Sequence, residues 1–103
     1  SAFLLNRSSD LEIPVKEEKK EEVIKQAETL INASRTHEGN ISYNLYQDVI
    51  DGSLIFIAKW ESKEALEAHM QTPEFIEFGE TIKESVTAPL GIKLIVGEEI
   101  EGN

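Results

Sequence analysis

The sequence predicts one α+β domain with the element order β-α-β-β-α-β, an antiparallel sheet and the helices on one face of that sheet. Three observations support this prediction. An amphipathic helical pattern follows the first strand, the hairpin signal Asp51-Gly52 separates two apolar strands, and two short helical patterns precede a last apolar strand. The chain of 103 residues has the length of one domain, which we expect to span residues 1–103 around a modest core.

The first strand is expected over residues 3–15, with an irregular or bulged course over residues 1–10. An apolar start is followed by the polar, turn-like residues 6–10. Beyond them the chain alternates with a period of two, and the apolar positions are Leu11, Ile13 and Val15. Pro14 has no amide proton to donate to a neighbouring strand, so we expect it at an edge or at the end of the strand.

A helix is expected over residues 16–32. Its apolar residues recur with the spacing of one helical face and are Val23, Ile24, Ala27, Leu30 and Ile31. The charged run over residues 16–22 is expected to face solvent. A turn over residues 36–40 should follow, in which Gly39 can adopt a positive φ at little cost.

Two strands over residues 41–47 and 53–60 are expected to form a hairpin. The period of two places Tyr43 and Asn44 on opposite faces, so at most one of them lines a given cavity. The second strand is apolar on both faces, which predicts that the sheet is covered on both sides. Because the helices would cover only one face, we expect the sheet of an identical chain on the other, in a two-fold dimer.

Two helices are expected next, the first capped by Ser62 and the second by Thr72, with Pro73 in the favoured first position. The apolar side of the first helix includes a histidine, and its members are Ala65, Leu66, His69 and Met70. The apolar side of the second comprises Phe75, Ile76, Gly79, Ile82 and Val86. A last strand is expected over residues 92–100, with a frayed end at Gly102-Asn103.

The net charge and the absence of cysteine exclude or disfavour several classes of binding partner and of site. With 10 basic and 20 acidic residues the formal net charge is −10, which disfavours nucleic acid and anionic membrane surfaces and favours a neutral or apolar small molecule. The absence of cysteine excludes disulfides, thiolate catalysis and thiolate metal sites. We see no spanning apolar run and no signal segment after Ser1-Ala2, so a cytoplasmic location is the expectation.

Four motifs in close succession resemble the antibiotic biosynthesis monooxygenase family. They are Glu38-x-Asn40-x-x-Tyr43, Trp60-Glu61-Ser62, Ala65-x-x-x-His69 and Pro73-x-Phe75-x-x-Phe78. The resemblance covers roughly residues 11–97 and implies a ferredoxin-like fold in which the sheets of two subunits pair in a homodimeric α+β barrel. It also implies a pocket between the helices and the sheet of each subunit, and a C-terminal dimerisation strand, here within residues 92–103.

The resemblance implies a cofactor-independent monooxygenase that oxidises a small aromatic, quinol or polyketide-like molecule with O₂. His69 is the candidate catalytic base, because an ordinary histidine pKa of about 6.5 suits the deprotonation of a phenol or enol. A core histidine bonded to a backbone carbonyl is the structural alternative. Asn44 is the candidate that orients the substrate, Trp60 and Phe75 are candidate apolar walls, and Tyr43 is a further candidate contact. Core packing alone would also explain Trp60 and Phe75, and Tyr43 could instead be an aromatic residue of the core or of the dimer face. Asn44 could instead satisfy a local backbone group.

Other functions remain open at this point. Ala58 stands where many relatives carry an acidic residue, which favours a non-catalytic small-molecule binder or an accessory dimer; an isomerase is a third alternative. Haem degradation is disfavoured, because Leu11, His69 and Gly79 occupy the positions of the residues that such relatives use. His37 is expected to be a solvated turn histidine without ligand spacing to His69, and no metal site is expected.

Overall fold

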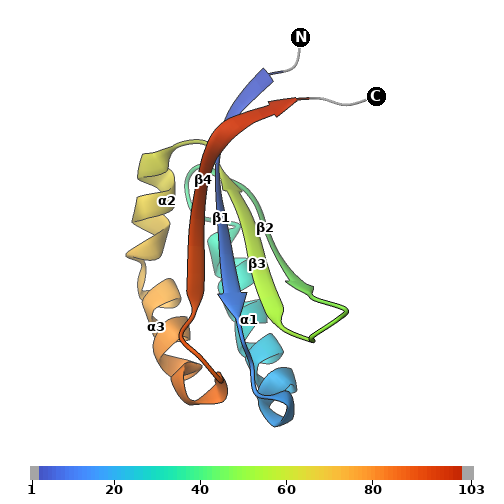
Figure 1. Ribbon diagram of the computed structural model, residues 1–103. Helices are drawn as coiled ribbons and strands as arrows, with labels where there is room; N and C mark the ends of the chain where they lie inside the picture. Colours follow the sequence, from blue (N-terminus) through green and yellow to red (C-terminus); the bar gives the residue numbers. More distant parts are fainter. Residues whose placement is uncertain (1–2, 101–103) are drawn as a thin grey trace.

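A computed structural model describes the backbone of residues 3–100 and the side chains of residues 8–95, so the frayed end expected at Gly102-Asn103 lies outside it. Its elements are β1 (Phe3–Ile13), α1 (Lys20–Ser34), β2 (Asn40–Gln47), β3 (Leu54–Trp60), α2 (Lys63–Met70), α3 (Pro73–Thr81) and β4 (Gly91–Ile100), with short 3-10 turns at Glu17–Lys19 and Lys83–Ser85. The three α-helices lie on one side of the sheet (Figure 1). The predicted fold class is confirmed.

The four strands form one antiparallel sheet in the order β2-β3-β1-β4. In the middle of the sheet, Leu11 of β1 lies opposite Phe56 of β3 and Ile92 of β4. The pairing of β1 with β3 begins at Arg7, whereas its pairing with β4 extends to Phe3. The start of β1 and the end of β4 therefore project together beyond the other strands (Figure 1).

The irregular or bulged course expected for the first strand is not observed, because β1 runs without interruption from Phe3 to Ile13. Its polar residues fit a regular strand, since Ser8 and Asp10 point to the face of the sheet away from the helices and the backbone pairs on both sides. The register shift of this sheet lies instead in β2, between Asn40 and Ser42. Pro14 follows the last residue of β1, as its missing amide proton requires.

The core lies between the helices and one face of the sheet. Alternate residues of β3 are buried there, and these are Leu54, Phe56, Ala58 and Trp60. The helices contribute Val23, Ala27, Leu30, Leu66 and Phe78, and Ile82 follows directly after α3. Within residues 3–100, no helix combines the length and the apolar character needed to cross a lipid bilayer.

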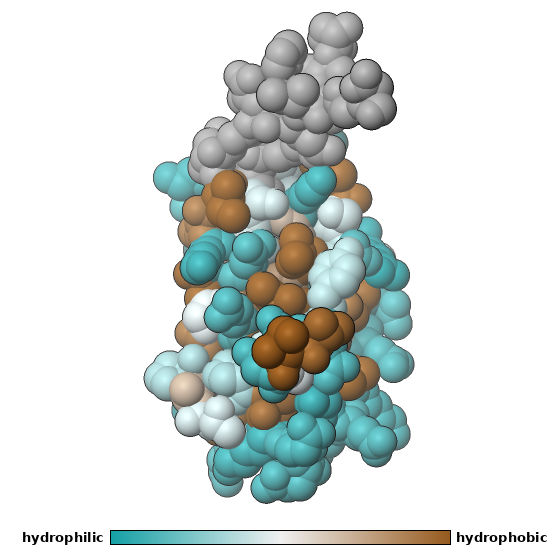
Figure 2. Space-filling model, turned by 45° about the vertical axis from the view of Figure 1, so that its right-hand side comes forward, coloured by the Kyte–Doolittle hydropathy of each residue, from teal (hydrophilic) through white to brown (hydrophobic). Residues whose placement is uncertain are grey.

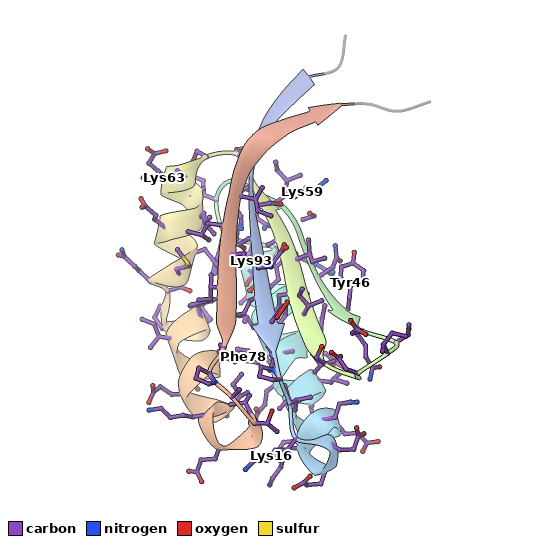
Figure 3. All side chains as sticks on the ribbon, in the orientation of Figure 1. Lys16, Tyr46, Lys59, Lys63, Phe78 and Lys93 are labelled. Carbon is purple, nitrogen blue, oxygen red and sulfur yellow. The ribbon has the colours of Figure 1, made fainter. Side chains whose placement is uncertain are left out.

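The open face of the sheet, away from the helices, mixes apolar and polar side chains. Tyr46 is 51% exposed and points away from the helices, and Ile95 is 48% exposed (Figure 3). In the space-filling view, separate brown areas alternate with teal and white ones (Figure 2). A second chain on this face stays a prediction, and sedimentation of the chain as a monomer at micromolar concentration would contradict it.

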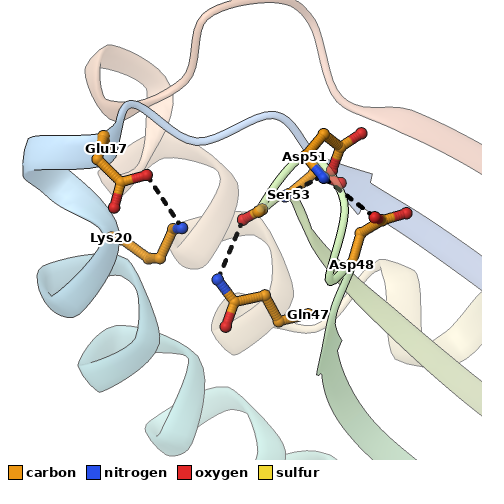
Figure 4. Close-up of polar contacts among 7 residues, drawn as sticks. Glu17, Lys20, Gln47, Asp48, Asp51 and Ser53 are labelled. Atoms are coloured by element: carbon orange, nitrogen blue, oxygen red, sulfur yellow. Dashed lines mark hydrogen bonds and ion pairs between the residues drawn. The ribbon is translucent and has the colours of Figure 1, made fainter.

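The hairpin predicted from Asp51-Gly52 joins β2 to β3. The Asp48 carboxylate accepts a hydrogen bond from the amide of Ile50 at 2.7 Å. It accepts a second from the amide of Asp51 at 3.2 Å, and the Asp51 carboxylate accepts one from the amide of Ser53 at 2.8 Å (Figure 4). Gly52 has a φ of +77°. These local bonds and the glycine explain why the chain reverses here.

Gly39 is a second position where glycine is required, and it predicts a stability effect. Its φ is +83°, and an added Cβ would lie 2.5 Å from the Cβ of Ala65 on α2. We expect Gly39→Ala to destabilise the fold by about 2 kcal/mol or more, because it adds a left-handed backbone penalty to a steric clash. Gly79→Ala on α3 is the matched control, since nothing lies within 4 Å of its added Cβ.

Urea unfolding of both variants measures this difference. Gly79→Ala should be neutral or stabilising by about 0.5–1 kcal/mol, because alanine is the better helix former. Equal unfolding midpoints for the two variants would contradict this prediction. They would show that the turn before β2 can move away from Ala65 at little cost in stability.

Candidate functional site

His69 is held at the junction of α2 and α3. The Ser62 hydroxyl caps α2 by accepting a hydrogen bond from the amide of Ala65 at 3.1 Å. The Thr72 hydroxyl accepts one from the amide of Phe75 at 3.3 Å and donates one to the carbonyl oxygen of His69 at 2.7 Å. The two predicted caps are therefore confirmed: Ser62 fixes the first turn of α2, and Thr72 holds the carbonyl of His69 at the last turn.

The imidazole of His69 is buried among other rings. Only 2% of the residue is exposed. The ring centroid lies 4.7 Å from that of Trp60, 5.0 Å from that of Phe75 and 5.1 Å from that of Tyr43. Three of the predicted site residues thus surround His69: Trp60 on β3, Phe75 on α3 and Tyr43 on β2.

His37 also contacts His69, and the expectation of a solvated turn histidine is wrong. The two Nδ1 atoms are 3.1 Å apart, and the side chain of His37 is only 16% exposed. The Nε2 atom of His37 lies 3.7 Å from a carboxylate oxygen of Glu74, at the start of α3. The turn after α1 packs closely against α2 at Gly39. This packing places His37, which lies in the same turn, in contact with His69.

The surroundings of His69 keep its imidazole neutral. Burial, and after it the neighbouring His37, lower its pKa from the ordinary 6.5 to about 4, and the Glu74 carboxylate opposes part of this shift. Burial also raises the pKa of Tyr43 to about 12, so this phenol keeps its proton at neutral pH. The site therefore presents a neutral imidazole beside a neutral phenol.

Two hollows meet at His69. The inner one is a cavity between the sheet and the helices, with about 10 Å³ of free volume, which is room for about one water molecule. Its lining is mostly apolar and comprises Ser9, Leu11, Tyr43, Phe56, His69, Met70, Phe75 and Ile92. The outer one is an open groove of about 420 Å³, which His37, Gly39 and Glu61 line together with His69.

Asn44 does not join the other predicted site residues. It pairs with Ile57, on the open face of the sheet, and its side-chain oxygen accepts a hydrogen bond from Arg35 at 3.0 Å. The period of two separates it from Tyr43, which points to the helices. Asn44 therefore does not lie beside His69, whereas Tyr43 and Phe75 line the inner cavity.

Trp60 is fully buried and touches the ring of His69 without lining the inner cavity. Trp60 is a packing residue of the core that contacts the imidazole outside the cavity. Among residues 8–95, no group of three or more His, Cys, Asp or Glu side chains is arranged to hold a metal ion, and the two histidines stand as a pair.

Comparison with known proteins gives a consistent result. The family model described as antibiotic biosynthesis monooxygenase matches residues 10–81. The chain is 36% identical over 81 residues to YcnE of Bacillus subtilis, which is named as a candidate monooxygenase; the match covers 78% of this chain and 85% of that protein. It is 42% identical over 83 residues to an uncharacterised protein of Synechocystis, and the match covers 80% of this chain but only 56% of that protein.

Among solved structures, the chain is similar to a conserved protein of Methanosarcina mazei. The TM-score is 0.85 at 24% identity, over 89% of this chain and 92% of that one. This likeness supports the fold.

Proposed function

The chain belongs to the antibiotic biosynthesis monooxygenase family, and from this premise we propose that it is a monooxygenase that oxidises a small aromatic or quinol-like molecule with O₂, without a metal or organic cofactor. The observation that carries the proposal is the neutral imidazole of His69 at the edge of an apolar, aromatic-lined cavity between the helices and the sheet. The aromatic lining of this cavity suits a planar apolar substrate, and the imidazole supplies the proton acceptor.

The reaction can be written for anthrone, whose CH₂ group becomes a carbonyl. A base removes one proton from this carbon, and the resulting anion transfers one electron to O₂. The substrate radical and superoxide combine to a peroxide, which takes up a proton and loses water. One oxygen atom enters the product and the other leaves as water, so the substrate supplies all the electrons that O₂ needs.

His69 is the proposed base. Its Nδ1 faces His37, which leaves Nε2 as the ring nitrogen available to a substrate. Tyr43 keeps its phenolic proton and is a suitable donor to the oxygen of the substrate. Phe75 and Phe56, on the wall of the cavity, would stack against the substrate rings.

Substrate entry requires the cavity to widen, because about 10 Å³ is far below the several hundred Å³ of an ordinary ligand pocket. The movable part of its wall is formed by Met70 and Phe75, which are partly buried, and by Ile92 at the sheet edge, which is 50% exposed. Displacement of these three side chains would open the cavity toward β4 without disturbing the packing behind His69.

Oxygen uptake tests the proposal. Anthrone and 1,4-naphthohydroquinone are supplied as probes to the full chain in an oxygen electrode, with a chelator present and heat-unfolded protein as the control. We expect uptake above the control, with one O₂ consumed per anthrone. Oxygen uptake equal to that of the heat-unfolded control with every probe would contradict the proposed activity.

A non-catalytic binder of small apolar molecules is the second candidate. Ala58 favours it, because this residue is buried opposite Tyr43 and supplies no acid to the site. Calorimetry with anthraquinone separates the two candidates, because tight binding without any oxygen uptake from the probes is the result expected of a binder alone.

A further inference from the structure

Three titratable side chains form a line from the inner cavity to the surface. His69 is 2% exposed, the side chain of His37 is 16% exposed and that of Glu74 is 44% exposed. The Nδ1 atoms of the two histidines are 3.1 Å apart, and 3.7 Å separates Nε2 of His37 from the carboxylate of Glu74. The three come from the end of α2, the turn before β2 and the start of α3.

We propose that these residues are a proton relay, in which His37 receives the Nδ1 proton of His69 while Nε2 of His69 takes the proton of the substrate. This inference rests on the proposed function, because it assigns the fate of the proton that His69 removes. Before the step, His69 carries its proton on Nδ1 and donates it to Nδ1 of His37. Afterwards His69 is neutral again with its proton on Nε2, and His37 is an imidazolium beside the Glu74 carboxylate. One proton leaves the substrate and one is gained by His37.

The relay solves an energetic problem of the site. Burial and the neighbouring His37 together hold the pKa of His69 at about 4, so an imidazolium at His69 would be costly at neutral pH. Transfer to His37 places the positive charge on a less buried ring that lies 3.7 Å from a carboxylate oxygen. The outer groove then gives the proton a route to water, since His37 lines it.

Other titratable groups surround the pair and must be considered in any pH profile. Tyr43 faces His69 from β2, and its raised pKa of about 12 keeps it neutral over the range in which histidine titrates. Carboxylates line the outer groove from the turn before β2 and from the start of α2, and they are Glu38, Glu61 and Glu64.

Two substitutions of His37 separate proton transfer from simple positioning. In His37→Asn the amide oxygen can still accept the hydrogen bond from Nδ1 of His69, but it cannot take the proton. In His37→Ala both functions are lost. We expect each variant to lower the kcat of anthrone-dependent oxygen uptake by about 10²-fold, the low end of what general acid–base catalysis contributes. Free imidazole should restore part of the rate of His37→Ala.

Glu74→Gln should lower kcat by less, since water in the outer groove can also accept the proton. Glu77→Gln is its matched control, because Glu77 lies one turn further along α3 and, unlike Glu74, forms no ion pair with His37 among the described residues; its rate should equal that of the wild type. A wild-type rate in His37→Asn would reduce His37 to a hydrogen-bond acceptor and overturn the relay.

A measurement that does not depend on turnover decides the inference independently. The ¹⁵N chemical shifts of the histidine rings in the wild-type chain at pH 7.5 report which nitrogen carries each proton. The relay requires a protonated Nδ1 and a bare Nε2 on His69, and the opposite tautomer would overturn it. If the wild type shows no oxygen uptake, the proposed function fails while the tautomers still decide whether the relay geometry exists.

Discussion

Replacing His69 with glutamine is expected to lower anthrone-dependent oxygen uptake by about 10²–10⁴-fold, the range that a positioned general base contributes. Glutamine can occupy the space of the imidazole and form hydrogen bonds, but it cannot accept a proton from the substrate. The loss should appear in kcat rather than KM, because the base acts in the transition state and the apolar walls of the cavity are unchanged.

Asn44→Ala is the matched control for this experiment. Asn44 was a candidate site residue on sequence grounds, but it lies on the open face of the sheet with Arg35. We expect Asn44→Ala to keep the wild-type rate. A full loss of oxygen uptake in Asn44→Ala, together with an unchanged rate in His69→Gln, would show that the reaction takes place on the open face of the sheet. It would contradict the assignment of the site to His69.

Acidification is expected to destabilise the fold through His69, by up to about 3 kcal/mol between pH 6.5 and pH 4. The pKa of His69 is about 4 in the folded protein and 6.5 in an unfolded chain. Within this window the unfolded chain binds the proton and the folded one does not, so the free energy of unfolding falls as the pH falls. Well above pH 6.5, His69 is neutral in both states and contributes no pH dependence.

Urea unfolding of the wild type and of His69→Gln at a series of pH values isolates this effect. The chain has 20 acidic residues, whose titration adds to the pH dependence of both proteins and cancels in the difference. We expect the wild type to lose more stability than His69→Gln between pH 6.5 and pH 4. If the free energy of unfolding varied with pH in the same way for both proteins, His69 would take up its proton in the folded state as readily as in the unfolded chain. That result would contradict the lowered pKa of His69.

Much of the fold follows from local patterns in the chain. The caps Ser62 and Thr72, the glycine turn at Gly52 and the period of two in β3 each act through neighbouring residues, so short stretches of sequence are enough to predict them. The fold class follows from their order. The continuity of β1 was missed because its polar residues are typical of turns, although they alternate between two faces of a paired strand.

The site was harder to predict, because it depends on contacts between distant segments. His37 and His69 are separated by 32 positions, and no spacing rule connects a turn residue with the last turn of a later helix. The opposite faces of Tyr43 and Asn44 follow from the strand period, but which face meets the helices depends on the register. The register shift at the start of β2 also leaves Ile41 51% exposed, although it alternates with Tyr43 in the sequence.

Oxidation of anthrone under ¹⁸O₂ tests the central proposal most directly, namely that the chain is a monooxygenase whose substrate supplies the electrons. Mass spectrometry of the anthraquinone should show one ¹⁸O atom per molecule in the wild type, formed far faster than in His69→Gln, in ordinary water with a chelator present. Product formed no faster than with heat-unfolded protein, or product without the label, would contradict the proposal.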